Sequence, residues 1–107
     1  MGSERMVFVA APTPFLASGA FDPDALRQNI GLWLEAGIDG ILVLGTTGEA
    51  IHLDDAESDA VISVARAAVP AGRRLLVGTG RPTTAATIRA TGRAADLGAD
   101  LALVLTP

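Results

Sequence analysis

The chain has 107 residues, and 50% of them are hydrophobic, which is enough for one domain with a buried core and too apolar for a disordered segment. Its formal net charge of −4 argues against nucleic-acid binding, because proteins that bind nucleic acid normally present a basic face. All 8 basic residues are arginine and no cysteine occurs, which excludes disulfides, thiolate metal sites and a lysine Schiff base within these residues.

The sequence also argues against a membrane or secreted protein. No apolar run approaches the roughly 20 residues that a membrane-spanning helix needs. Near the N-terminus, Glu4 disfavours a positively charged leader, and Pro12 and Pro14 interrupt the apolar stretch that a signal peptide would require. We therefore expect a cytoplasmic protein without a targeting signal.

The first part of the chain predicts a strand, a helix and a second strand. Met6–Ala11 and Gly40–Leu44 are continuous apolar runs, which are typical of strands buried on both faces of a parallel sheet. Between them, Asp22 and Pro23 predict an N-cap and the first residue of a helix. The apolar face of that helix consists of Leu26, Ile30, Trp33 and Leu34. We expect Trp33 to be a core residue and not a ligand platform.

The second part repeats this alternation. The stretch 54–57 matches a capping box with aspartate in the first position, and it predicts a second helix. Leu75–Val77 and Leu101–Leu105 are the third and fourth predicted strands, and Thr83 or Thr84 begins the helix between them. The predicted inner faces of these two helices are Ala60, Val61, Val64, Ala65 and Ala68, and Ala85, Ile88, Gly92 and Ala95.

A weak internal repeat supports this order of elements. The stretch 36–44 matches the stretch 97–105 in rhythm, and each has a glycine where a helix C-terminus favours a left-handed residue. Asp39 and Asp100 then lie at strand entrances. Since that edge of an α/β sheet is remote from the usual active site, we expect both aspartates to have structural turn roles.

The pattern of four strands alternating with three helices leaves two architectures open. It fits the first half of a (β/α)8 barrel, and it also fits a small open sheet of the flavodoxin or Rossmann type. A complete barrel takes roughly 250 residues. Because the chain ends at Pro107, directly after a predicted strand, we expect it to be the first part of a longer polypeptide.

The loops after the predicted strands are rich in glycine and threonine, a composition that suits binding of an anionic oxygen. In Gly45-Thr46-Thr47-Gly48-Glu49, two hydroxyl groups flanked by glycines can donate hydrogen bonds to one carboxylate. The alternative is a tight turn whose threonines satisfy local backbone groups. We expect Glu49 to have a structural role and His52 to lie in an exposed loop. The stretch 78–80 lacks the third glycine of a dinucleotide-binding motif.

Four motifs, in order and spacing, resemble the dihydrodipicolinate synthase / N-acetylneuraminate lyase family. They are Ala10-Ala11-Pro12-Thr13-Pro14-Phe15, Gly45-Thr46-Thr47-Gly48-Glu49, Val77-Gly78-Thr79-Gly80 and Leu105-Thr106-Pro107. The resemblance spans the whole chain and implies that residues 1–107 are the N-terminal part of a single TIM-barrel domain, with no internal boundary. It also implies a lyase or synthase that binds pyruvate or a related 2-oxo acid and makes or breaks a C–C bond. No cofactor or metal is implied, and members of the family usually assemble as homotetramers, so we expect a homo-oligomer, either a dimer or a tetramer.

The resemblance also implies roles for individual residues. Gly45, Thr46 and Thr47 match the residues that hold the pyruvate carboxylate, Thr46 matches a member of a proton relay, and Ala10 matches a small residue lining the pocket. The pair Thr46-Thr47 favours the dihydrodipicolinate synthase branch over the sialic-acid lyase branch. The Schiff-base lysine and the relay tyrosine of the family are absent, because the chain has no lysine and stops at Pro107 where relatives continue with tyrosine.

These absences define the expected function and its alternatives. We expect the 107 residues alone to be inactive and to contribute to catalysis when the rest of a barrel is present. The alternative is a non-catalytic half-barrel that binds small carboxylates or associates with itself, because exposed edge strands pair readily with other chains. A nucleotide-binding open sheet is a third interpretation, and it depends on the stretch 78–80 alone.

Overall fold

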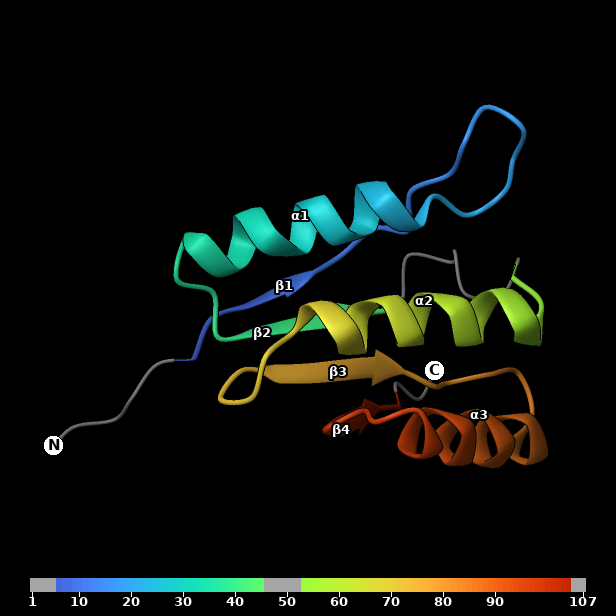
Figure 1. Cartoon of the computed structure of the whole chain (residues 1–107). Helices are drawn as coiled ribbons and strands as arrows, with labels where there is room; N and C mark the ends of the chain where they lie inside the picture. The colour runs from blue at the N-terminus through green and yellow to red at the C-terminus, as the bar shows by residue number, and fades with distance from the viewer. Residues whose placement is uncertain (1–5, 46–52, 105–107) are drawn as a thin grey trace, which may run out of the picture.

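A computed structural model describes residues 6–45 and 53–104. Within these residues, strands and helices alternate along the chain as the sequence predicts (Figure 1). The elements are β1 (Phe8–Ala10), α1 (Pro23–Glu35), β2 (Gly40–Val43), α2 (Asp55–Ala68), β3 (Arg74–Gly78), α3 (Thr84–Asp96) and β4 (Leu101–Leu103).

The four strands form one parallel sheet in the order β1-β2-β3-β4. Every strand is therefore hydrogen-bonded to the strand that precedes or follows it in sequence. A flavodoxin-like sheet places β1 between β2 and β3, and a Rossmann sheet places β4 beside β1, whereas here β1 pairs with β2 and β4 pairs with β3, so this sheet is neither of them. Right-handed crossovers that all step in one direction place the three helices on one face of the sheet (Figure 1). The fold is the first half of a (β/α)8 barrel, and this prediction is confirmed.

The hydrophobic core lies between the sheet and the helices. Ile41 of β2 and Leu75 of β3 are neighbours in the sheet register, and both are fully buried. They belong to one cluster with Leu26 and Ile30, the inner residues of α1. Trp33 is half-buried and packs against the same cluster, which confirms its predicted place in the core.

The start signals of the first two helices are confirmed. The Asp22 side chain caps α1 by accepting a hydrogen bond from the amide of Ala25 at 3.0 Å, and proline follows as the first helical residue. Asp54 and Glu57 form the predicted capping box of α2, because each side chain accepts a hydrogen bond from the other residue's backbone amide. Both helices therefore begin where local sequence chemistry places them.

The inner faces of α2 and α3 require correction. In α2, Ile62 is buried and the predicted inner residue Ala60 is exposed. In α3 the predicted face is wrong: all its members are exposed, including Ile88 at 66%. The inner side of α3 carries Ala94, which is fully buried, and two threonines whose hydroxyl groups bond to the preceding loop.

The strand entrances have the structural role predicted for the two aspartates. The Asp39 carboxylate accepts a hydrogen bond from the amide of Val7, and the Asp100 carboxylate accepts one from the amide of Leu75, both at 2.7 Å. That bond and the one from the Arg66 guanidinium at 3.2 Å lower the pKa of Asp100 below its ordinary value. Each aspartate thus fixes its own strand beside the preceding strand in the sheet.

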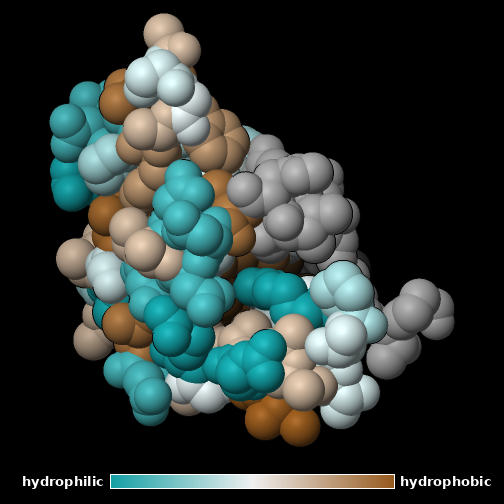
Figure 2. Space-filling model, turned by 90° about the vertical axis from the view of Figure 1, so that its right-hand side faces the viewer, coloured by the Kyte–Doolittle hydropathy of each residue, from teal (hydrophilic) through white to brown (hydrophobic). Residues whose placement is uncertain are grey.

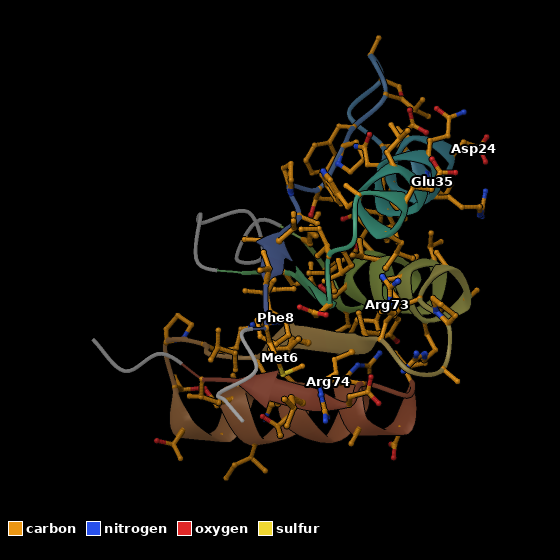
Figure 3. All side chains as sticks on the ribbon, turned by 90° about the vertical axis from the view of Figure 1, so that its left-hand side faces the viewer. Met6, Phe8, Asp24, Glu35, Arg73 and Arg74 are labelled. Atoms are coloured by element: carbon orange, nitrogen blue, oxygen red, sulfur yellow. The ribbon has the colours of Figure 1, made fainter. Side chains whose placement is uncertain are left out.

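The other face of the sheet carries apolar side chains without helices over them. Leu76 and Leu101 pair in register on this face, and Phe8 lies one row nearer the amino ends of the strands. Phe8 and Leu101 are 41% and 48% exposed. Figure 3 shows Met6, Phe8 and Arg74 near one another at the amino ends of the strands. This face corresponds to the interior of a barrel. None of the helices in residues 6–45 and 53–104 has the length and apolar character needed to cross a membrane.

Candidate functional site

The candidate site lies at the carboxyl ends of the strands, which meet at one edge because the sheet is parallel. Figure 2 looks onto this side of the molecule, where hydrophilic residues occupy much of the surface. Of the predicted site residues, the structure describes Ala10 and Gly45. Thr46 and Thr47 lie outside the described residues, and so do the stretch 48–49 and His52. Their predicted roles stay predictions.

Ala10 lies where a pocket-lining residue of this edge would be. It is the last residue of β1, it is exposed, and it pairs in register with Leu42 of β2. The next residue, Ala11, is buried in the core, and its amide donates to the carbonyl of Leu42 at 2.8 Å. Side chains alternate along a strand, so Ala10 faces the barrel interior while Ala11 faces the helices.

The backbone after β2 turns sharply towards β3. Leu44 has a positive φ of 56°, which is uncommon for a residue other than glycine, and its side chain is buried. The turn takes Leu44 and Gly45 across the end of the neighbouring strand. A Cβ atom on Gly78, the last residue of β3, would lie 2.2 Å from the Leu44 carbonyl oxygen and 3.1 Å from the Gly45 Cα. Sequence reasoning missed this close approach.

The loop after β3 is hydrogen-bonded to β4 on one side and to α3 on the other. The Thr79 amide donates to the carbonyl of Leu103 in β4 at 3.0 Å, and the fully buried Thr79 hydroxyl accepts from the Thr91 hydroxyl at 2.9 Å. The amide of Arg81 donates to the Thr87 hydroxyl at 2.9 Å. Since the fold uses these groups, the loop is a structural connection. Together with the strand order, this removes the basis for a nucleotide-binding open sheet.

A groove of about 530 Å³ lies along α3, between that helix and the start of α2. Arg81, Arg89 and Arg93 line it together with Asp55 and Asp96, so its charges are mixed. The Arg93 guanidinium pairs with the Asp59 carboxylate, which raises the pKa of Arg93 above its ordinary value. Within residues 6–45 and 53–104, no group of three or more His, Cys, Asp or Glu side chains is placed to hold a metal ion.

Comparisons with known proteins all point to one family. The model of the "Dihydrodipicolinate synthetase family" matches residues 3–107. A 4-hydroxy-tetrahydrodipicolinate synthase from Stenotrophomonas maltophilia is 46% identical over 101 residues, which cover 94% of this chain and 34% of that protein. The chain thus spans about a third of the length of the curated relatives that it matches.

Solved structures give the same result. The crystal structure of dihydrodipicolinate synthase from Aquifex aeolicus superposes with a TM-score of 0.86 at 37% identity, over 94% of this chain and 34% of that chain. A prophage protein of the dihydrodipicolinic acid synthase family from E. coli, solved in complex with pyruvate, superposes with a TM-score of 0.87 at 30% identity. That likeness covers 95% of this chain and 34% of the other.

Proposed function

Because this chain belongs to the dihydrodipicolinate synthetase family, we propose that it forms the pyruvate-binding N-terminal half of a Schiff-base lyase or synthase. In this proposal, residues 1–107 are one part of a single barrel domain, and the complete barrel catalyses formation or cleavage of a C–C bond. The relative from S. maltophilia is named a synthase, which favours the synthetic direction for this chain as well.

The observation that carries this proposal is the position in the fold of Gly45, the first residue of the Gly45-Thr46-Thr47 motif. Gly45 follows β2 at the carboxyl edge of the sheet, and the exposed Ala10 ends β1 at the same edge on the interior side. Active sites of (β/α)8 barrels are built at this edge. The relative solved with pyruvate shares this half of the fold, which supports a 2-oxo acid as the ligand.

The residues of the motif have the chemistry for holding a carboxylate. The hydroxyl groups of Thr46 and Thr47 and the amide of Gly45 are hydrogen-bond donors, and bonds to a charged acceptor are stronger than neutral ones. Holding the carboxylate fixes the ketone carbon for attack by an amine, which gains rate through proximity and orientation. Thr46 then takes part in the proton relay that moves the protons of this step. The amine itself is a lysine outside these 107 residues, since the chain has none.

We propose in addition that the enzyme works in the cytoplasm as a dimer or tetramer. The family resemblance implies both features. The exposed apolar side chains on the outer surfaces of two helices, Leu32 of α1 and Ile88 of α3, are consistent with contacts to other subunits.

A chimera tests the catalytic proposal. It joins residues 1–107 to the part of the S. maltophilia synthase that follows the matched segment, and it is treated with pyruvate and sodium borohydride. We expect reduction to trap pyruvate covalently on one lysine, which intact-mass and peptide analysis would locate in the appended part. The 107-residue chain alone is the control and should give no lysine adduct.

Two results would overturn the proposal. One is a folded chimera that traps no pyruvate while the intact S. maltophilia synthase does so under the same conditions. The other is saturable binding of pyruvate by the 107-residue chain alone without any trapping in the chimera, which would support the non-catalytic carboxylate-binding alternative.

A further inference from the structure

We propose that Leu44 and Gly78 are positioning residues for pyruvate: the left-handed backbone at Leu44, which only a glycine at position 78 accommodates, directs Gly45, the residue that leads into the motif, over the end of β3. This inference rests on the proposed function, because it assigns a purpose to the backbone that leads into the carboxylate-binding motif. Neither residue touches the substrate in this proposal.

The first observation is the space over Gly78. A Cβ atom at this position would lie 2.2 Å from the Leu44 carbonyl oxygen and 2.9 Å from the Leu44 carbonyl carbon. Both neighbours are backbone atoms, so no side-chain rotation relieves the overlap. Any larger residue at position 78 would therefore move the chain at Leu44 and Gly45 away from the end of β3.

The second observation is the conformation of Leu44. Its φ of 56° lies in the left-handed region, and it is the non-glycine residue with positive φ in the described residues. Such a conformation costs free energy and persists where the surrounding structure fixes it. Here the surroundings are the core, because the Leu44 side chain is 3% exposed and belongs to the buried cluster. The buried side chain thus holds the backbone in its turn.

Both observations concern the backbone of Leu44 and its contact with Gly78. β2 runs parallel to β3 up to the pair Val43 and Val77. The residues that follow this pair in the chain, Leu44 and Gly78, make the close approach. If Leu44 had an extended backbone, Gly45 would continue along the strand direction. With the left-handed turn, Gly45 crosses to β3, and Thr46 and Thr47 follow directly in the chain. The direction in which the chain leaves β2 is therefore set at Leu44 and Gly45, before the first hydroxyl group of the motif.

The first test replaces glycines in the chimera. Gly78→Ala should raise the pyruvate concentration that gives half-maximal borohydride trapping by about tenfold, which corresponds to about 1.4 kcal/mol of binding free energy. Gly40→Ala is a matched control on the same sheet, since its Cβ would meet the Phe8 ring at 2.3 Å at the opposite edge. Gly31→Ala is a second control, because nothing lies within 4 Å of its Cβ position on α1. Both controls should leave half-maximal trapping unchanged.

The second test changes Leu44 without changing its volume greatly. Leu44→Ile keeps an apolar side chain in the core but adds a branch at Cβ, which strongly disfavours a left-handed backbone. Leu44→Met is unbranched and adapts to core space. We expect half-maximal trapping to require more pyruvate for Leu44→Ile than for Leu44→Met. This comparison decides the question if Gly78→Ala fails to fold by circular dichroism.

The outcomes separate this inference from the proposed function. If the parent chimera traps pyruvate and Thr47→Val weakens trapping, the proposed function stands. The positioning role is then overturned if Gly78→Ala behaves like Gly40→Ala, or if Leu44→Ile and Leu44→Met have equal effects. A merely structural role predicts loss of melting temperature without a selective change in pyruvate affinity. If the parent chimera traps nothing, the proposed function fails and this inference fails with it.

Discussion

At the scale of residues, short polar contacts determine where the chain turns. The carboxylates of Asp39 and Asp100 each accept a hydrogen bond from a backbone amide of the preceding strand segment. Both structural roles follow from the position of the aspartate at a strand entrance. The sequence predicts these roles because an aspartate between a glycine turn and an apolar run has few other partners. The turn at Leu44 has no such signal, since leucine is not a residue that favours positive φ.

Thr47→Val in the chimera should weaken binding of pyruvate. The substitution keeps the shape of the side chain and removes a hydroxyl donor to a charged group, which costs about 1.5 to 3 kcal/mol. Measurement of KM and kcat, together with half-maximal trapping, checks this prediction. Unchanged values of all three would contradict a carboxylate-binding role for Thr47.

Asp100→Asn should lower stability near neutral pH and lose its effect in acid. Because the folded-state pKa of Asp100 is lowered, its carboxylate stabilises the fold above its unfolded pKa of about 3.9, and this contribution disappears as pH falls through the lower folded value. Melting temperatures of the chimera and its variant, measured from neutral pH down into the acid range, should converge. A constant difference across that range would show that the charge of Asp100 is not what stabilises the strand entrance.

At the scale of elements, helix starts follow from local sequence and helix faces do not always do so. The caps of α1 and α2 involve residues three apart in the chain, so the sequence contains the whole contact. The inner face of α3 is set by hydroxyl groups of Thr87 and Thr91 that bond to the loop after β3. Hydrophobic periodicity cannot detect a partner that only the folded chain provides.

This difference gives a prediction for two isoleucines. Ile30→Ala should cost about 2–5 kcal/mol of the free energy of unfolding, because the side chain is fully buried in the core. Ile88→Ala should change that free energy by less than about 0.5 kcal/mol, because the side chain is 66% exposed on α3. Urea unfolding of the two chimera variants checks both values. A large loss for Ile88→Ala would mean that its helix face is covered, for example by a second subunit.

At the scale of the whole molecule, the sheet has two edges and one uncovered apolar face. Within the described residues, β1 and β4 each pair with one strand, and Phe8 and Leu101 are exposed. The sequence predicts the order of elements but leaves two sheet topologies open, because both have the same alternation of strands and helices. The order β1-β2-β3-β4 decides between them, and it is a property of long-range pairing.

The 107-residue chain alone should associate. Unpaired edges and an exposed apolar face favour pairing with further chains. Light scattering during size-exclusion chromatography should give a mass that exceeds the 10.9 kDa monomer and rises with concentration. Leu101→Lys, on the uncovered face of β4, should shift the distribution towards the monomer, and Ser63→Lys, at an exposed position of α2, serves as its control. A monomer at every concentration would contradict this prediction.

The sequential order of the strands has a consequence for synthesis of the protein. Each of β2, β3 and β4 pairs with a strand that left the ribosome about thirty residues earlier, as the bond between Val7 and Asp39 illustrates with its separation of 32 residues. Among the strands of residues 6–45 and 53–104, each one after β1 finds its partner already synthesised, so each new strand and helix can dock onto the preceding ones during translation. The nascent polypeptide can therefore extend the sheet at one growing edge, and that edge is β4.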